Sequence, residues 1–212
     1  MKQELENAMK QNDKAKAADV ALQALEGGMD LVELYSGVLA PMLNAIDCAE
    51  DDFECVWLEH QMTSITRTIV EMGYAYVLKR RRVPEESKHV LIACPREEYH
   101  ELGAIMGGQF LELAGFKTTY IGANTPLETI DAALRTLEVD FLALSVSNAY
   151  HLFEVRHIIA HIRNEHPHVR IIGAGRGFEN HEAAFRSSIA YLITSYASVE
   201  EMAEAEGLAC SH

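Results

Sequence analysis

The segment PREEYHELGAIMGGQF places a carboxylate and an imidazole two residues apart, just after an apolar run typical of a β-strand. These residues are Glu98 and His100. A histidine that ligates a metal usually has its other ring nitrogen fixed by a carboxylate or carbonyl group, which sets its tautomer and basicity. Glu98 can do this for His100. The pair therefore favours a metal-ligating imidazole over the alternative of a solvated or capping histidine at a helix start.

Glycines follow this pair inside an expected helix. Gly103, Gly107 and Gly108 occupy three of six positions, although a glycine in a helix interior costs about 1 kcal/mol relative to alanine. They remove side chains from one helix face, so either a flat or bulky ligand lies against it or the helix packs closely on a sheet. Gly175 and Gly177, in GAGRGF, do the same after another expected strand. Together these glycines predict a slot beside His100.

The elements that must position these residues begin near residue 89, where short β-branched or apolar runs alternate with helical segments. The expected strands are 89–94, 117–122, 141–146, 169–174 and 190–195. The expected helices are 99–115, 126–137, 150–165, 179–187 and 197–207. This alternation predicts a parallel, doubly wound α/β sheet of five strands in flavodoxin-like (Rossmann-type) order. Ligands of such sheets bind outside the carboxyl ends of the strands, where the Glu98–His100 motif lies.

The first 82 residues have helical periodicity throughout and predict a four-helix bundle. Asp13 is a candidate cap for a helix that ends at Gly27-Gly28. Pro41 implies a kink or a break in the next helix, because proline lacks the required N–H. The acidic EDDFE then opens a long helix that ends at KRRR, which suits the helix macrodipole. We expect a bundle over 1–82, a linker over 83–88 and an α/β domain over 89–212.

Composition narrows the function classes. The 32 acidic and 18 basic residues give a net charge of −14, which argues against direct binding of nucleic acid or an anionic membrane. The polar N-terminus and the lack of long apolar runs predict neither a signal peptide nor a membrane span. The four cysteines have no CxxC spacing, and Cys94 lies in an apolar run as expected of a buried thiol, so we expect a cytoplasmic, reducing location.

Two other motifs have alternative interpretations. GAGRGF suggests a dinucleotide fingerprint, but it lacks the G-x-G-x-x-G spacing and an acidic residue ending the next strand. His157 and His161 are spaced i, i+4, as two zinc ligands can be. No HExxH glutamate follows, so we interpret the segment with His166 and His168 as a polar helix face and turn.

Taken together, the motifs resemble those of cobalamin-binding domains. E-x-H-x-x-G, the serine-rich third strand end and Ala174-Gly175 are similar to the D-x-H-x-x-G, S-x-L and G-G signature of that family. ALEGGMDLVELYSGVLAPMLNAI, followed by LEHQMTS, is similar to the four-helix cap preceding this domain in methionine synthase. The light-sensing cobalamin-dependent MerR-type repressors share both E-x-H-x-x-G and the Glu59-His60 pair.

The resemblance implies that His100 is the lower axial ligand of cobalt and that Glu98 orients it. It also implies a slot for the nucleotide tail and a cap over the upper corrin face. The slot would be formed by Gly103, Ser145, Ser147, Gly175 and Gly177, and the cap by Glu59 and His60.

The sequence departs from the light sensors at the cap. A tryptophan lies ten residues before the glutamate in those proteins, followed in some by a histidine; here Ala49 and Glu50 hold these places. Trp57 is interpreted either as part of the cover over the corrin or as bundle core.

Three functions follow from the resemblance. The first is a cobalamin-dependent light or cobalamin sensor, signalling through a protein partner such as a transcription factor. The second is a corrinoid methyl carrier serving methyltransferases, and the third is an interaction module that has lost the cofactor. No catalytic residue stands out independently of the corrin, and a homo-oligomer is possible in each case.

Overall fold

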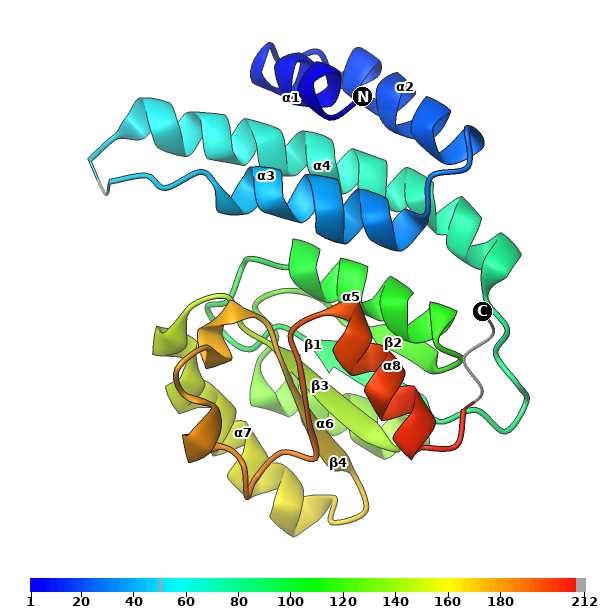
Figure 1. Cartoon of the computed structure of the whole chain (residues 1–212). Helices are drawn as coiled ribbons and strands as arrows, with labels where there is room; N and C mark the ends of the chain where they lie inside the picture. The colour runs from blue at the N-terminus through cyan, green and yellow to red at the C-terminus, as the bar shows by residue number, and fades with distance from the viewer. Residues whose placement is uncertain (50, 209–212) are drawn as a thin grey trace. The chain divides into compact units, whose positions relative to one another are not determined.

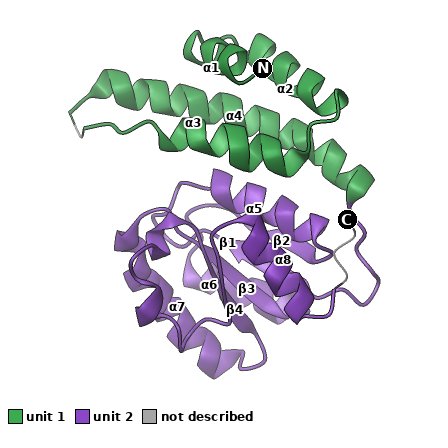
Figure 2. Cartoon of the chain, viewed as in Figure 1, with its two compact units in different colours: residues 1–80 green, residues 81–212 purple. Residues whose placement is uncertain are grey.

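The structure, a computed structural model, describes residues 1–49 and 51–208. The chain divides into two compact units, residues 1–80 and residues 81–212 (Figure 2). Each unit is described by itself.

The first unit is helical. Its helices are α1 (Lys2–Lys10), α2 (Lys14–Glu26), the π-helix η1 (Glu33–Leu39), which runs into α3 (Ala40–Asn44), and α4 (Phe53–Arg80). The side chain of Asp13 caps α2 by accepting from the Lys16 backbone N–H at 2.9 Å. The change from π- to α-geometry occurs just before Pro41, which cannot donate a helical hydrogen bond.

A tyrosine from η1 fixes the long helix α4. Tyr35 is fully buried, and its hydroxyl donates to the Val70 carbonyl at 3.0 Å. A Cβ at Gly73 would lie 2.1 Å from that hydroxyl, so a glycine is required there. The connection into α4 also carries a disulfide between Cys48 and Cys55. The spacing of the cysteines does not predict this bond, and with a disulfide present the cysteines do not support the expected reducing compartment.

The second unit contains a parallel five-stranded sheet of order β2-β1-β3-β4-β5. The strands are β1 (His89–Ala93), β2 (Lys117–Tyr120), β3 (Phe141–Ser145), β4 (Arg170–Ala174) and β5 (Tyr191–Ile193). In register, Leu91 pairs with Leu142, and Ser145 pairs with Ala174. The predicted flavodoxin-like order is confirmed.

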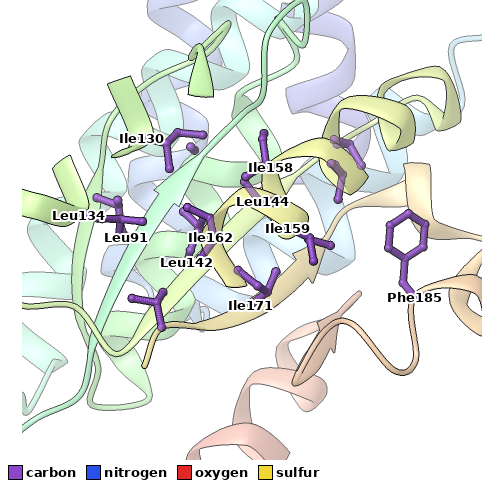
Figure 3. Close-up of a cluster of buried hydrophobic side chains, with 14 of the residues drawn as sticks. Leu91, Ile130, Leu134, Leu142, Leu144, Ile158, Ile159, Ile162, Ile171 and Phe185 are labelled. Atoms are coloured by element: carbon purple, nitrogen blue, oxygen red, sulfur yellow. The ribbon is translucent and has the colours of Figure 1, made fainter. Parts of the chain in front are cut away.

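Helices cover both faces of the sheet (Figure 1). They are α5 (Leu102–Leu113), α6 (Leu127–Thr136), α7 (Leu152–Glu165) and α8 (Tyr196–Ala205). Side chains of α6 and α7, including Ile130, Ile158 and Ile162, pack with Leu91 and Leu142 in one buried cluster (Figure 3). On the opposite face α5 contacts α8 through an edge-on stack of Phe110 and Tyr196, with ring centroids 5.2 Å apart.

One predicted helix is wrong. The segment 179–187 contains only the 3₁₀ turn η4 (Glu182–Ala184), which follows another turn, η3 (Arg176–Phe178). Phe178 and Phe185 are buried and stack edge-on with centroids 5.2 Å apart. These two aromatic anchors hold an irregular connection against the sheet, and their spacing mimics helical periodicity.

Candidate cofactor site

The loop after β1 turns sharply and presents Glu98 to the interior. The Glu98 backbone N–H donates to the Pro95 carbonyl at 3.0 Å, and Glu97 has a positive φ of 67°. Asn124, from the loop after β2, holds this turn from outside. Its side chain accepts from the Glu97 N–H at 2.8 Å, and its own N–H donates to the Glu98 carbonyl at 2.9 Å. Two neighbouring strand ends therefore fix the position of Glu98.

The Glu98 carboxylate is completely buried and accepts hydrogen bonds at both oxygens. Its Oε1 lies 2.7 Å from His100 Nδ1 and accepts from the His100 backbone N–H at 2.9 Å. Its Oε2 accepts from the Ser147 backbone N–H at 2.7 Å. The carboxylate thus ties the loop after β1 to the loop after β3.

These contacts determine the ionisation of Glu98 and the tautomer of His100. Burial alone would raise the pKa of Glu98, but hydrogen bonds from the His100 ring and from the Ser147 and His100 amides lower it to about 2. An ionised carboxylate only accepts hydrogen bonds, so His100 Nδ1 carries the proton. Nε2 is then the ring nitrogen with a lone pair suited to a metal, and the His100 side chain is 66% exposed.

The glycines beside His100 separate into two groups. Cβ atoms at Gly103 and Gly107 would meet nothing within 4 Å, whereas one at Gly108 would approach Ile92 Cδ1 at 3.1 Å. Packing on the sheet therefore accounts for Gly108. It does not account for Gly103 or Gly107, which leave open space along α5.

The loops after β3 and β4 lie against each other. Gly177 donates its N–H to the Val146 carbonyl at 2.9 Å. A Cβ at Gly175, which has a φ of +92°, would lie 2.4 Å from that same oxygen. Ser145 is buried at the end of β3, and Ser147 contacts Glu98 through its amide. Close backbone packing thus explains both glycines, and their role toward a nucleotide tail stays a prediction.

A second polar group lies beside the loop after β1. The Tyr120 hydroxyl donates to Glu101 at 2.5 Å and lies 3.9 Å from Cys94 Sγ. Burial raises the pKa of the Cys94 thiol to about 12. Burial and the bond to Glu101 also raise the pKa of Tyr120. Cys94 is therefore a protonated, buried thiol, as its apolar context predicted.

The predicted cap residues all lie on α4 of the helical unit. Trp57 is 62% exposed, His60 is exposed and Glu59 is partly buried. The interpretation of Trp57 as bundle core is therefore wrong. Ala49 is described, whereas Glu50 lies outside the described residues. The role of Glu59 and His60 toward a corrin stays a prediction.

Two histidines, one on α7 and one just after it, contact the same aspartate of α6. His161 and His166 both point Nε2 at Asp131 Oδ1 of α6, at 3.0 and 2.8 Å, and Arg135 binds the same carboxylate. His157 is exposed. Within residues 1–49 and 51–208, no group of three or more histidine, cysteine or acidic side chains is arranged to hold a metal ion.

Sequence reasoning missed three residues of these polar groups: Asn124 and His151 beside Glu98, and Tyr120 beside Glu101 and Cys94. Asn124 carries a signal, because asparagine tolerates the left-handed φ of 49° that it adopts after Gly122. Tyr120 and His151 gave none, since a tyrosine ending a strand and a histidine opening a helix occur in many contexts. His151 Nε2 lies 3.8 Å from Glu98 Oε2.

A doubly wound sheet carries an oriented imidazole at the carboxyl end of β1, beside an open glycine face, and this arrangement is suited to a metal-containing cofactor. Comparison with family models identifies the cofactor. Residues 88–205 match the B12 binding domain, and the chain belongs to that family. Its cofactor is cobalamin. The residues fit this group: the buried Glu98 carboxylate orients the exposed His100 ring, and Gly103 and Gly107 leave open space along α5.

Two curated proteins of Myxococcus xanthus are similar in sequence. The HTH-type transcriptional repressor CarH is 29% identical over 135 residues, covering 63% of this chain and 43% of CarH. The HTH-type transcriptional repressor CarA is 28% identical over 121 residues, covering 57% of this chain and 39% of CarA. The chain thus spans less than half the length of either relative.

Solved structures share the fold over nearly the whole chain. The monomethylamine corrinoid protein of Methanosarcina barkeri matches with a TM-score of 0.76 and 13% identity, over 95% of this chain and 96% of that one. The corresponding values for the methanol:cobalamin methyltransferase complex MtaBC, from the same organism, are 0.52 and 12%, over 96% and 78%. In the described part of the chain, no helix has the length and apolarity needed to cross a membrane.

Proposed function

We propose that this protein is a corrinoid methyl carrier, which presents cobalamin-bound methyl groups to partner methyltransferases. The observation that carries the proposal is the extent of the likeness to the monomethylamine corrinoid protein, which takes in the helical unit as well as the B12 binding domain. The curated repressors, by contrast, align over less than two thirds of this chain.

In this proposal the cofactor supplies the chemistry, since a cobalt centre in cobalamin takes up and releases a methyl group. The protein's own residues bind and orient it. His100 would ligate cobalt through Nε2, while Glu98 retains the proton on Nδ1 and keeps the ring basic. Gly103 and Gly107 leave the adjacent helix face open. A cytoplasmic location is part of the same proposal. It rests on the expected methyltransferase partners and not on the cysteines, two of which form a disulfide.

Methyl transfer by the loaded protein tests the proposal. The full chain is reconstituted with methylcobalamin and incubated with corrinoid-dependent methyltransferases and a thiol acceptor. In parallel, the bound hydroxocobalamin is reduced chemically and its conversion to Co(I) is followed by visible spectroscopy. We expect reduction to Co(I) and transfer of the methyl group in the wild type. In His100→Ala, reduction to Co(I) should not be harder, but less methyl group should be transferred because less cobalamin is retained.

The exposed His157 provides a matched control, because His157→Ala removes an imidazole from the same unit with no contact to Glu98. This variant should behave as wild type. The carrier function would be refuted if the bound cobalamin does not reach Co(I) and none of the methyltransferases transfers its methyl group to the thiol.

A cobalamin-dependent sensor is the second candidate, and the sequence similarity to CarH and CarA favours it. The exposed Trp57 and His60 on α4 are then the groups available to respond to the upper ligand. The net charge of −14 suits signalling through a protein partner rather than direct contact with DNA.

Illumination separates the two candidates. Protein loaded with adenosylcobalamin is compared in the dark and after light by gel filtration and by spectroscopy. A sensor changes its oligomeric state or its partner affinity on illumination, and Trp57→Ala or His60→Ala alters that change. A methyl carrier loses the adenosyl group without a change in assembly.

A further inference from the structure

The hydrogen-bonding capacity of the buried Glu98 carboxylate exceeds the contacts described so far. An ionised carboxylate offers about four acceptor positions, two on each oxygen. The His100 ring and His100 amide occupy Oε1, and the Ser147 amide occupies one position on Oε2. The side chain is 0% exposed, so bulk water does not reach the remaining position.

His151 faces that remaining position. Its Nε2 lies 3.8 Å from Glu98 Oε2, within ion-pair range but longer than a direct hydrogen bond, and its side chain is only 20% exposed. The turn η2 (Ala149–His151) places it there. The Asn148 side chain caps this turn by accepting from the Tyr150 N–H at 3.0 Å, and the His151 N–H donates to the Asn148 carbonyl at 3.1 Å.

We propose that His151 is a second positioning residue for the cobalt ligand and acts through Glu98. When Nε2 closes the 3.8 Å gap to hydrogen-bond distance, it donates to Oε2 and fixes the far oxygen of the carboxylate, so that Oε1 stays aligned with His100 Nδ1. The loop after β1 and the start of α7 then set the orientation of His100 together. This inference deepens the proposed function, because it concerns the same imidazole, but it holds for a carrier and a sensor alike.

The proposal assigns a specific consequence to the loss of the Nε2 donor. Without it, Oε2 keeps only the Ser147 amide, and the carboxylate can rotate away from Nδ1. The proton on the His100 ring is then no longer confined to Nδ1. Loss of a partner that contacts a ligand directly typically weakens metal ligation 10- to 100-fold. His151 acts one step further out, through Glu98, so we expect the lower end of this range.

Two substitutions of similar size separate a donor from a space-filling group. His151→Gln retains an N–H donor, whereas His151→Leu retains bulk without one. Histidine-labelled, cofactor-free full-chain protein is measured by ¹⁵N NMR, and the His100 signals are assigned by their loss in His100→Ala. We expect His100 protonated on Nδ1 in the wild type and in His151→Gln, and a mixture of tautomers in His151→Leu.

Cobalamin release supplies an independent readout. Loaded with hydroxocobalamin, His151→Leu should release it about 10-fold faster than the wild type, with His151→Gln in between and His157→Ala unchanged. Equal tautomer populations and equal release rates in His151→Leu and the wild type would overturn the proposal. The NMR result is independent of methyl transfer, so failure of the carrier function and failure of this inference are distinguishable.

Discussion

Strand β1 begins with one histidine, His89, and is followed by another, His100. The two imidazoles differ in their exposure and in the charge of their hydrogen-bond partners. At the amino end of the strand, His89 is 6% exposed. Its Nδ1 lies 2.8 Å from the Glu138 carbonyl, and its Nε2 lies 2.9 Å from the Thr119 hydroxyl. Both ring nitrogens are committed to neutral partners inside the fold, so this imidazole stabilises structure.

Beyond the carboxyl end, His100 has an ionised partner and an exposed ring. A carboxylate on Nδ1 makes Nε2 more basic, whereas the neutral partners of His89 leave neither nitrogen available. The comparison teaches that burial alone does not identify a ligand histidine. Between these two histidines, the ionised partner on Nδ1 and the exposed ring distinguish the predicted ligand His100 from the structural His89.

The largest effects are expected from two alanine variants, one of which should lose stability and the other cobalamin affinity. His89→Ala should lower the free energy of unfolding by about 2–3 kcal/mol, since it removes two buried hydrogen bonds and leaves a cavity, with cobalamin affinity retained. His100→Ala should lower cobalamin affinity by about 100-fold and stability by at most about 1 kcal/mol. Chemical denaturation and equilibrium dialysis measure the two quantities. Similar losses of both quantities in both variants would contradict the distinction.

Acid titration of Glu98 tests the charged partner itself. Its pKa is about 2 in the folded protein, below its ordinary value near 4.5. Its stabilisation is therefore complete above about pH 4.5 and is lost as the pH falls toward 2, amounting to at most about 3 kcal/mol. Glu98→Gln should flatten the dependence of unfolding free energy on pH in this window, and should weaken cobalamin binding about 10-fold at neutral pH.

The exposed neighbour Glu97 is the control for that titration. Glu97→Gln makes the same substitution at an exposed neighbouring side chain, and the slope of its unfolding free energy between pH 4.5 and 2.5 is the reference for Glu98→Gln. A Glu98→Gln curve with the same slope as wild type would show that the hydrogen bonds to Glu98 do not favour its charged form.

The sequence predicted the sheet well because its strands are short, apolar and separated by helices of regular length. The order of the five strands and the position of the Glu98–His100 motif at their carboxyl ends both followed from this alternation. The exception, 179–187, shows the limit of periodicity. Phe178 and Phe185 anchor an irregular loop with the same spacing that two turns of helix would use.

At the site, the motif predicted the contact of Glu98 with His100 but not the contacts that depend on loop geometry. Ser147 was predicted from its type, yet it contacts Glu98 through its backbone N–H, which any residue except proline could supply. Asn124 and His151 reach Glu98 only because the loops after β2 and β3 converge there. Such convergence depends on tertiary packing and has no local sequence signature.

Helix α5 provides a smaller test at the same end of β1. Gly103→Ala should raise the free energy of unfolding by about 0.5–1 kcal/mol, because alanine is the better helix former and its Cβ meets nothing within 4 Å. The same change should weaken cobalamin binding a few-fold if the cofactor lies along this face. In Gly108→Ala the Cβ must instead displace Ile92 Cδ1, so that variant should gain little or no stability. Unchanged cobalamin affinity in Gly103→Ala would place the tail elsewhere.

The smallest effect is expected at His161 and His166, which share the carboxylate of Asp131 and do not contact the histidines at either end of β1. Hydrogen bonds from Arg135, His161 and His166 hold the pKa of Asp131 well below its ordinary value. This carboxylate lies near the surface, where such pairs contribute little, so Asp131→Asn should cost about 0.5 kcal/mol. Cobalamin affinity should not change, because the cluster joins α6 to α7 away from Glu98. A loss of cobalamin affinity in Asp131→Asn would mean that a histidine–carboxylate contact elsewhere in the fold also affects the site. The contrast between His89 and His100 would then not explain which histidine serves the cofactor.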